Sequence, residues 1–555
     1  MARQFQQVGV VGLGAMGAGI VEVFARAGLA VVAVEVDGEA LARGRGRVES
    51  STLRAVTRGR LSAADQQALL DRIAFGVDLA AMAGCELVLE AVPERMGVKR
   101  ALFAQLDRIC GPETVFASNT SSLSVTDIAA STDRPGKVVG MHFFNPAPVM
   151  KLVEVVRTVV TDADVVGDVQ ALAAAVGKTP VTISDQAGFI GNALLFGYLN
   201  QAMTMLEAGY ATTHDIDLAM RLGGGMPMGP FALLDLIGLD VSQQILETMY
   251  RQSRDRRHAP APILRQMVTA GMLGRKAGQG FYRYAAPGSP EIVADRAEPA
   301  RPGPSRASAG ARAVLRVGVI GSGSLAAGIV EVFTTAGFDV LAVAADARAE
   351  GLADRQLVIE AVLDDLAAKR AVFAELDGIC APGAVLATTA GIVPVIECAA
   401  ATKRAGDVVG LHFSPPVAAT RLVEVVSTVS TSPQAARTAL ATVSRAGMDV
   451  VRCDDRAGFI VNALLYPYLN DALKMLQARY ASADDIDAAM KLGCGYSAGP
   501  IETLDRIGLD QALSVQRALY RQSRELGLAP APLLEQLVAA GRLGRKTGKG
   551  IRDCC

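Results

Sequence analysis

The sequence lacks an excess of charge of either sign. Its 555 residues include 55 Lys and Arg against 56 Asp and Glu, which leaves a net charge of −1. Proteins that bind nucleic acid or an anionic membrane usually carry a basic patch, and nothing in this balance points to one. With 51% hydrophobic and 20% charged residues, the composition is that of a folded globular protein. We therefore expect neither a nucleic-acid partner nor a membrane partner.

The sequence also lacks an uninterrupted apolar run of the kind that forms a signal peptide or a membrane span. The most apolar stretch near its start, residues 8–36, is broken by several glycines and by Glu22, Arg26 and Glu35. No strongly basic segment precedes this stretch, and no small-residue cleavage site follows it. We therefore expect no targeting segment there.

Cysteine spacings typical of metal sites are absent as well. The eight cysteines lie mostly far apart, and no CxxC or mixed Cys/His pattern occurs. Such cysteines are typical of buried thiols in a reducing compartment. Together with the missing targeting segment, they predict a cytoplasmic protein without a bound metal.

What the sequence does contain is a second copy of itself. Residues 140–156, GMHFFNPAPVMKLVEVV, return at 410–426 as GLHFSPPVAATRLVEVV. Residues 273–280, LGRKAGQG, return at 543–550 as LGRKTGKG, and both pairs are 270 positions apart. Most of the chain is therefore a tandem duplication. A chain of 555 residues suits about four domains, which two repeats of two domains each would supply.

The first repeat opens with the pattern of a dinucleotide-binding unit. Strands are expected over 8–11 and 29–34, with a helix between them and Glu35 directly after the second strand. The turn after the first strand consists of Gly12, Leu13, Gly14, Ala15, Met16 and Gly17. Its glycines permit a tight turn, close approach to a pyrophosphate, and close packing of helix on strand. Glu35 can accept hydrogen bonds from ribose hydroxyls, and because no Arg stands beside it in the sequence, NAD is favoured over NADP. The alternative is a glycine-rich turn without a ligand.

Strand and helix patterns place a Rossmann-type, doubly wound parallel sheet before an all-helical domain in each repeat. Further strands are expected at 86–91, 115–118 and 138–142, and the strand signal ends near residue 186. A helical insertion that carries several arginines occupies 38–75. The predicted parts are a Rossmann domain (1–185), a helical domain (186–284), a linker (285–313), a degenerate Rossmann domain (314–455) and a second helical domain (456–555).

The chain has only four histidines, and His142 ends a predicted strand at the sheet edge where open α/β folds bind ligands. A lone histidine is more often structural than catalytic, so its potential partners matter. Glu154 lies twelve residues further on in a strand-like run and can orient the imidazole, as the carboxylate of a catalytic triad does. Ser121 and Asn192 complete the candidate set. Glu154 as a solvated charge and Asn192 as an ordinary polar helix residue remain open alternatives.

Five segments of the first repeat resemble the 3-hydroxyacyl-CoA dehydrogenase family in their order and spacing. They are SNTSS at 118–122, HFFNP at 142–146, KLVEV at 151–155, GFIGNALL at 188–195 and GRKAGQGFYRY at 274–284. The resemblance covers nearly all of residues 7–284. It implies an α/β NAD-binding domain followed by an all-α C-terminal domain of the 6-phosphogluconate dehydrogenase type, which also forms the dimer interface.

The resemblance implies a role for each matching residue. His142 matches the catalytic base, Glu154 the carboxylate that orients it, and Ser121 with Asn192 the groups that bind the substrate oxygen. The positions that match cofactor contacts are Glu94, Lys99, Asn145 and Lys276.

The resemblance also implies the substrate. The basic insertion matches the helical hairpin that contacts coenzyme A, with Ser51 and Arg58 as the candidate contacts. The implied reaction is NAD-dependent oxidation of a (3S)-3-hydroxyacyl-CoA to the 3-oxoacyl-CoA and its reverse, with His142 as general base. A short acyl group, as in 3-hydroxybutyryl-CoA, is the default, and a dicarboxyl thioester is possible.

Two other functions remain as alternatives. A dehydrogenase of free 3-hydroxy acids would share the glycine turn, but the HFFNP and KLVEV segments disfavour it. A nonenzymatic, NAD-binding structural protein is disfavoured by the complete set of four site residues in the first repeat.

The second repeat has lost several of these residues. Ala344 stands in place of Glu35 and Gly391 in place of Ser121, and about 39 residues that include the basic insertion are missing. The retained site residues are His412, Glu424 and Asn462. The simplest interpretation is a degenerate, structural domain, and the alternative is a second active site of altered specificity. Because the helical halves are better preserved, we expect them to dock on each other within one chain as an intramolecular dimer, and further homo-oligomerisation stays open.

Overall fold

The structure is a computed structural model that describes residues 2–293, 310–344 and 349–553. Most of the predicted linker, 294–309, lies outside these described residues. Within the described ranges, none of the helices combines the length and the apolar character that crossing a lipid bilayer requires.

The chain divides into two compact units. The first contains the residues up to Leu195, together with Glu247–Asp255 and Ala472–Thr503. The second contains Phe196–Leu246, Arg256–Asp471 and the residues from Leu504 onward. Each unit therefore combines one sheet domain with helical segments from both repeats.

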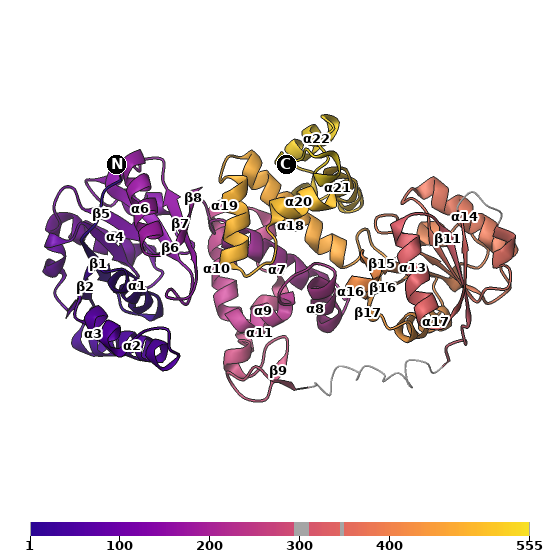
Figure 1. Cartoon of the computed structure of the whole chain (residues 1–555), viewed down its shortest axis with the longest axis horizontal. Coiled ribbons are helices and arrows are strands. Elements are labelled where there is room, and N and C mark those ends of the chain that lie inside the picture. Colours follow the sequence, from indigo (N-terminus) through magenta and orange to yellow (C-terminus); the bar gives the residue numbers. More distant parts are fainter. Residues whose placement is uncertain (1, 294–309, 345–348, 554–555) are drawn as a thin grey trace. The chain divides into compact units, whose positions relative to one another are not determined.

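The first unit is built on an eight-stranded sheet in the order β3-β2-β1-β4-β5-β6-β7-β8 (Figure 1). All neighbouring strands pair in parallel except β6 and β7, which are antiparallel. The strands are β1 (Gln7–Val11), β2 (Ala30–Val34), β3 (Ile73–Gly76), β4 (Leu87–Glu90), β5 (Val115–Ser118), β6 (Val138–Phe143), β7 (Leu152–Arg157) and β8 (Thr179–Ser184). The sequence did not predict β3, which ends the helical insertion and adds an edge strand.

Helices cover the sheet, so its central strands are apolar on both faces. Along β1, for example, Val8, Val10 and Val11 are all buried. The helices of this domain are α1 (Ala15–Arg26), α2 (Gly38–Thr57), α3 (Ala63–Leu70), α4 (Met96–Ile109), α5 (Val125–Ala129) and α6 (Ala163–Ala175). The carboxyl ends of the parallel strands, where open sheets bind ligands, carry the glycine turn, Glu35, Ser121 and His142.

The helical part of the first repeat follows β8 directly. Its helices are α7 (Gly191–Glu207), α8 (Thr213–Leu222), α9 (Pro230–Ile237), α10 (Leu239–Ser253) and α11 (Pro262–Thr269). It ends in an antiparallel pair of short strands, β9 (Arg283–Tyr284) and β10 (Ile292–Val293). The start of the predicted linker is therefore structured, because the chain folds back there and β10 pairs with β9.

The second repeat has the same architecture with one strand fewer. Its sheet order is β12-β11-β13-β14-β15-β16-β17, and the described residues of this repeat include no counterpart of β3. The strands are β11 (Arg316–Gly321), β12 (Asp339–Val343), β13 (Leu357–Ala361), β14 (Val385–Thr388), β15 (Val408–Phe413), β16 (Leu422–Ser427) and β17 (Asp449–Asp454). The helices are α13 (Ser324–Thr335), α14 (Leu366–Ile379), α15 (Val395–Ala399), α16 (Val417–Thr420), α17 (Pro433–Arg445), α18 (Val461–Gln477), α19 (Ala483–Ala488), α20 (Pro500–Ile507), α21 (Leu509–Ser523) and α22 (Pro532–Ala539). The predicted pair of a Rossmann-type sheet and a helical domain, occurring twice, is confirmed.

Helical segments pack on the sheet of the other repeat. In the first unit, α19 and the short π-helical turn η7 (Ala489–Gly493) lie against β8 and β7. In the second unit, α8 lies against β17 and β16. In that unit Gln201 on α7 also donates its side-chain N–H to the carbonyl oxygen of Ala463 on α18, at 2.8 Å. The repeats are thus interlocked through their helical segments.

Candidate functional site

The glycine turn after β1 has the backbone form that a dinucleotide phosphate needs. Gly12 has a φ of +90°, and a Cβ there would lie 2.8 Å from the carbonyl oxygen of Ala91. A Cβ at Gly17 would lie 1.8 Å from the carbonyl oxygen of Gly12, so only glycine lets α1 begin this close to the strand. A Cβ at Gly14 would meet nothing within 4 Å, and the N-terminus of α1 therefore faces open space. These residues fit an NAD pyrophosphate.

Glu35 lies at the end of β2 and binds the same turn. Its Oε1 accepts a hydrogen bond from the backbone N–H of Leu13 at 2.6 Å. Arg47 on α2 donates to the carbonyl oxygen of Leu13 at 3.2 Å. The sequence showed no Arg beside Glu35. The fold brings Arg47 of the insertion to the glycine turn. Among the described contacts there is no ion pair between Arg47 and Glu35. The predicted contact of Glu35 with the adenosine ribose stays a prediction.

His142 and Glu154 are cross-strand partners in the antiparallel pair β6 and β7. The imidazole Nδ1 lies 2.7 Å from Glu154 Oε2, and both side chains are buried, with 8% and 1% of each residue exposed. Because a carboxylate can only accept, Nδ1 carries the hydrogen and the lone pair of the neutral ring is on Nε2. The backbone N–H groups of Ile190 and Gly191 donate to Glu154 Oε1 at 3.1 and 3.2 Å. The start of α7 thus fixes Glu154, and Glu154 fixes the imidazole.

Ser121 and Asn192 come together beside this pair. Asn192, on the first turn of α7, donates from Nδ2 to the carbonyl oxygen of Ser121 at 3.3 Å. Gln252 on α10 donates to the carbonyl oxygen of the next residue, Ser122, at 2.9 Å. The sequence analysis missed Gln252, because no motif surrounds it. The four predicted catalytic residues therefore share one unit, in which α7 and α10 hold the loop that carries Ser121.

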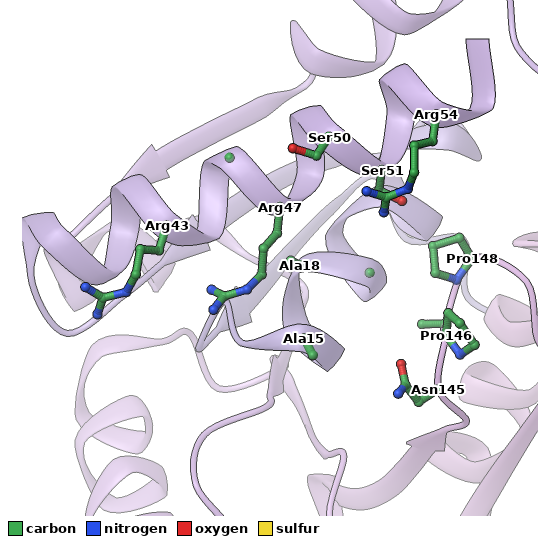
Figure 2. Close-up of a pocket in the computed structure, with 13 residues that line it drawn as sticks. Ala15, Ala18, Arg43, Arg47, Ser50, Ser51, Arg54, Asn145, Pro146 and Pro148 are labelled. Atoms are coloured by element: carbon green, nitrogen blue, oxygen red, sulfur yellow. The ribbon is translucent and has the colours of Figure 1, made fainter. Parts of the chain in front are cut away.

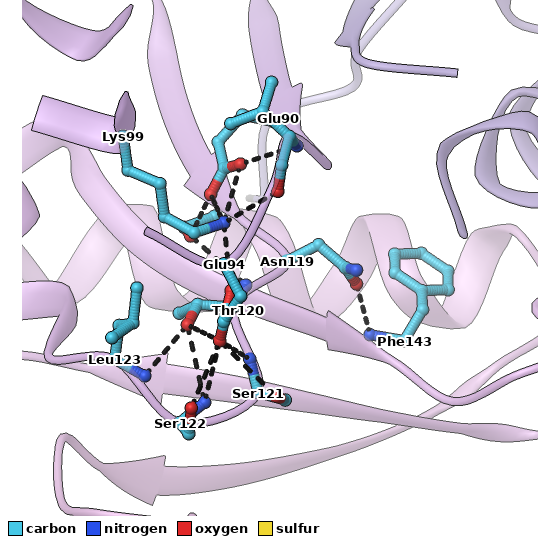
Figure 3. A network of polar contacts seen from close by, with 11 residues as sticks. Glu90, Glu94, Lys99, Asn119, Thr120, Ser121, Ser122, Leu123 and Phe143 are labelled. Carbon is cyan, nitrogen blue, oxygen red and sulfur yellow. Dashed lines mark hydrogen bonds and ion pairs between the residues drawn. The ribbon is translucent and has the colours of Figure 1, made fainter. Parts of the chain in front are cut away.

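A network of carboxylates around Lys99 holds the same loop (Figure 3). Lys99 is 1% exposed, and its ammonium lies 2.8 Å from Glu90 Oε1 and 3.2 Å from Glu94 Oε2. Glu94 Oε1 accepts from the Thr120 hydroxyl at 2.6 Å and from the Ser121 N–H at 2.9 Å. Burial alone would raise the pKa of Glu94, but Lys99, Thr120 and Ser121 together outweigh it and lower this pKa. Glu94 and Lys99 were predicted as cofactor contacts, and in the structure they also position the Ser121 loop. Glu90 was not predicted.

A second link joins the ends of neighbouring strands. The side-chain oxygen of Asn119, directly after β5, accepts a hydrogen bond from the backbone N–H of Phe143 at 2.8 Å (Figure 3). This contact ties the loop that carries Ser121 to the end of the strand that carries His142.

A cavity of about 580 Å³ opens between α1, α2 and the loop that contains Asn145. Figure 2 shows the guanidinium groups of Arg43, Arg47 and Arg54 along α2, with Asn145 across from them. Ser50 and Ser51 also line it. Asn145, predicted as a cofactor contact, and Ser51, predicted as a coenzyme A contact, both line this cavity, and their contacts with these ligands stay predictions.

Arg58, by contrast, caps the C-terminal end of α2 and is not one of the residues that line this cavity. The helical phase of α2 turns Arg43, Arg47 and Arg54 to the cavity. The predicted contact of Arg58 with coenzyme A stays a prediction.

Lys276 belongs to the second unit. Its ammonium lies 2.5 Å from Asp240 Oδ1. The predicted contact of Lys276 with the cofactor stays a prediction.

The second repeat keeps part of this arrangement. His412 Nδ1 lies 2.6 Å from Glu424 Oε2, and Asn462 donates to the carbonyl oxygen of Gly391 at 3.3 Å. Gly391 supplies no hydroxyl between them. The backbone of the second glycine turn also differs, since Gly323 has a φ of +93° where the matching Gly14 has −59°. Among the described residues, no cluster of His, Cys, Asp or Glu could hold a metal ion in either repeat.

The sequence was compared with known protein families. Residues 7–186 and 342–456 match the family described as "3-hydroxyacyl-CoA dehydrogenase, NAD binding domain". Residues 188–284 and 458–554 match "3-hydroxyacyl-CoA dehydrogenase, C-terminal domain". The match to the second NAD-binding domain begins only after the second glycine turn.

Individual relatives match one repeat or both. A 3-hydroxybutyryl-CoA dehydrogenase of Mycobacterium tuberculosis is 45% identical over 286 residues, which is 51% of this chain and all of that protein. A 3-hydroxyadipyl-CoA dehydrogenase of Escherichia coli K12 is 33% identical over 542 residues, which is 97% of this chain and 98% of that protein. The crystal structure of a 3-hydroxybutyryl-CoA dehydrogenase from Escherichia coli K12 superimposes with a TM-score of 0.74 at 30% identity, covering 97% of this chain and all of that one.

Proposed function

The chain belongs to the 3-hydroxyacyl-CoA dehydrogenase family, whose NAD-binding and C-terminal domains it contains twice, and from this membership we propose that its first repeat oxidises a (3S)-3-hydroxyacyl-CoA to the 3-oxoacyl-CoA. The observation that carries the proposal is the buried His142–Glu154 pair, which lies in one unit with Ser121 and Asn192. The reverse reduction uses the same groups.

The proposed mechanism begins with the tautomer of His142. Its Nδ1 hydrogen is engaged by Glu154 at 2.7 Å, so Nε2 is free to accept the proton of the substrate hydroxyl. Glu154 then stabilises the imidazolium, and its own position is fixed by two backbone N–H groups at the start of α7. The hydroxyl of Ser121 and the amide of Asn192 hold the substrate oxygen so that its carbon is correctly oriented.

NAD, when bound, supplies the acceptor for the hydride that leaves this carbon. The glycine turn from Gly12 to Gly17 and Glu35 would hold it, since the turn offers backbone N–H groups at an open helix N-terminus. Glu94 and Lys99 shape the loop that carries Ser121 next to that position.

Coenzyme A is proposed to lie with its phosphates in the cavity beside α2. The cavity is lined by three guanidinium groups and two serine hydroxyls, which are the groups that bind phosphate best. Ser51 belongs to this set. The alternative of a free hydroxy acid as substrate would leave this basic cavity without a role.

The acyl group is proposed to be short, as in 3-hydroxybutyryl-CoA. A relative that shares the whole tandem layout is named for 3-hydroxyadipyl-CoA, so a dicarboxyl thioester is the second candidate. Comparing kcat/KM on both thioesters and on free 3-hydroxybutyrate would decide among the three. We also propose that the protein acts in the cytoplasm.

The test of the proposed reaction compares two matched variants. His142→Gln is expected to lower kcat by about 10²-fold or more, because a general base is lost. His412→Gln removes the corresponding residue of the second repeat and is expected to leave kcat near that of the unmodified enzyme. Both are measured as NADH formation at 340 nm, with NAD binding measured separately. Near-normal turnover by His142→Gln would overturn the proposal, and loss of turnover only in His412→Gln would move the active site to the second repeat.

We further propose that the two helical domains form an intramolecular dimer. In the second unit, Gln201 on α7 bonds to the backbone of α18, and the rings of Tyr198 and Tyr468 lie in edge contact with centroids 6.4 Å apart. Arg257 and Asp471 form an ion pair in the same unit. Each contact joins a residue of the first repeat to one of the second.

A further inference from the structure

The strand that carries Glu154 is covered by residues of the second repeat. Within the first unit, α19 and η7 lie against β8 and β7. The backbone N–H of Ser184, at the end of β8, donates to the carbonyl oxygen of Tyr480 at 3.3 Å. The second repeat therefore reaches the sheet at the strand next to the catalytic pair.

Gly493, the last residue of η7, lies closest to the site. A Cβ at this position would lie 2.8 Å from Leu152 Cδ2 and 3.0 Å from Phe144 Cε1. The first distance is shorter than real side chains show and the second is unusually tight, so a larger residue at 493 would have to displace Leu152 and press on Phe144. The backbone of the second repeat therefore packs directly against the side chain of Phe144.

Phe144 passes this contact on to the catalytic pair. Its ring centroid lies 4.8 Å from that of the His142 imidazole. The Cζ atom of the same ring would lie 3.4 Å from a Cβ at Gly191. Gly191 is at the start of α7, and its backbone N–H binds Glu154. A shift of Phe144 would therefore move both His142 and the anchor of Glu154.

Cys494 directly follows Gly493 at the end of η7, which lies against β7, the strand that carries Glu154. Burial raises the pKa of the Cys494 thiol to about 12, and the negative charge of Glu154 raises it further. The thiol is therefore neutral, and the second repeat presents Glu154 with an uncharged surface. A neutral surface does not compete with His142 for the carboxylate.

The same packing occurs, with the repeats exchanged, in the second unit. A Cβ at Gly223 of the first repeat would lie 2.7 Å from Leu422 Cδ2, and the N–H of Asp454 donates to the carbonyl oxygen of Tyr210 at 3.3 Å. This arrangement lies beside Glu424, where the serine of the first site is replaced by Gly391. Gly223 is therefore a matched control for Gly493 within the same chain.

We propose that Gly493 and Cys494 of the second repeat are positioning residues for the His142–Glu154 pair, so that the degenerate repeat takes part in the reaction of the intact one. The inference rests on the proposed role of His142 as the base. It gives the second repeat a function beyond docking: η7 holds Phe144 against the imidazole and closes the space behind Glu154.

The test adds one methyl group at each of the two matched glycines in the full chain. Gly493→Ala is expected to push Phe144 and Leu152 and to lower kcat by about tenfold or more, with KM for NAD within about twofold, because small displacements of a base are costly. Gly223→Ala adds the same methyl beside the second site, so it is expected to lower the thermal midpoint comparably and to leave kcat within about twofold. Equal kcat in the two variants would overturn the inference.

A second pair of variants covers the case in which Gly493→Ala does not fold. Cys494→Ser keeps a small neutral group and is expected to retain kcat. Cys494→Asp places a carboxylate beside Glu154 and is expected to lower kcat by about tenfold, since like charges at short distance repel. Retained kcat in Cys494→Asp, with circular dichroism unchanged, would refute the inference.

The outcome for His142→Gln separates this inference from the proposed function. If His142→Gln is inactive while Gly493→Ala and Cys494→Asp are fully active, only the positioning role fails. If His142→Gln is active, the assignment of the base fails and the positioning role fails with it.

Discussion

At the scale of single residues, Glu154 serves two neighbours at once. One oxygen accepts from His142 and the other accepts from two backbone N–H groups, so this carboxylate with 1% exposure has no idle acceptor atom. Burying a charge is costly unless it is paired and hydrogen-bonded. Here β6 supplies the imidazole and the start of α7 supplies the backbone N–H groups that satisfy the carboxylate. If Glu154 lacked some of these hydrogen bonds, the imidazole of His142 would not return to the same position at each turnover.

The motif of the first repeat located these residues, because their order and spacing are specific. It did not reveal Glu90 on β4, which pairs with Lys99, or Gln252 on α10, which binds the Ser121 loop. A single Glu or Gln inside a strand or helix carries no local signal, and only the fold shows what it touches.

The cavity beside α2 leads to a residue-scale prediction. Arg54→Gln is expected to raise KM for the acyl-CoA by about tenfold, since one charge-assisted hydrogen bond to phosphate contributes on the order of 1.5 kcal/mol, while kcat and KM for NAD stay constant. Arg60→Gln removes the same charge from the same insertion away from the cavity and should leave all three constants unchanged. Steady-state kinetics with both substrates varied measures this.

Arg58→Gln is the third variant of that series, and because Arg58 does not line the cavity, its effect on KM for the acyl-CoA is expected to be smaller than that of Arg54→Gln. An effect on KM equal to that of Arg54→Gln would restore Arg58 as a coenzyme A contact and contradict the assignment of the cavity.

At the scale of elements, helix ends are held by buried aspartates. Asp217 on α8 accepts from the N–H groups of Phe231 and Ala232 at 2.8 and 3.1 Å, which are orphan donors at the start of α9. Asp487 does the same for α20 in the second repeat. The duplication thus preserved a cap that does not depend on the active site.

Asp217 gives a pH-dependent prediction. Burial raises its pKa to about 6, although the N–H groups of Phe231 and Ala232 and the hydroxyl of Tyr282 oppose the shift. A carboxyl with a raised pKa contributes stability that is fully present below its ordinary value near 4 and is lost as pH rises through about 6. The stability of the native chain relative to Asp217→Asn, whose side chain does not titrate, should therefore fall by about 3 kcal/mol between these pH values and then stay level.

Calorimetric midpoints of both proteins between pH 4 and pH 8 would measure this difference. A difference that grows with rising pH would mean that the folded protein favours the ionised form of Asp217, contrary to the prediction.

Among the strands of the first repeat, the sequence did not predict β8, which has six residues, or the shorter strands β3, β9 and β10. β3 has four residues and the β9–β10 pair has two residues in each strand. Segments this short contain too few positions for a period of two to stand out, and their pairing partners decide whether they form.

At the scale of the whole molecule, the two repeats exchange helical segments. Each compact unit contains a sheet from one repeat and helices from both, so neither repeat buries its apolar surfaces alone. This interlocking explains why the helical half of the second repeat stayed similar while Glu35 and Ser121 were replaced there by Ala344 and Gly391.

The interlocking predicts how the chain behaves when it is cut. With a protease site introduced between residues 294 and 309, the two halves should remain together on gel filtration and keep the activity of the uncut chain, because the contacts of α7 with α18 and of η7 with β7 do not need the linker. Analytical size exclusion and the 340 nm assay before and after cleavage test this. Separation of the halves under native conditions would contradict the intramolecular dimer.

A variant in the interface provides the control for that experiment. Tyr468→Ala removes a side chain that is 4% exposed and packs against Tyr198, so it should weaken the association of the cut halves by about 3 kcal/mol or more.

The sequence by itself determined the duplication, the Rossmann-type sheet followed by a helical domain in each repeat, and the family, because periodicity, glycine turns and spaced motifs are local patterns. It also singled out His142, Glu154, Ser121 and Asn192. Only the tertiary structure decided which arginines face the cavity, which carboxylate binds the Ser121 loop, and that η7 of the second repeat lies against β7. These contacts join residues that are far apart in the chain, and their energies depend on burial and distance, which no local pattern encodes.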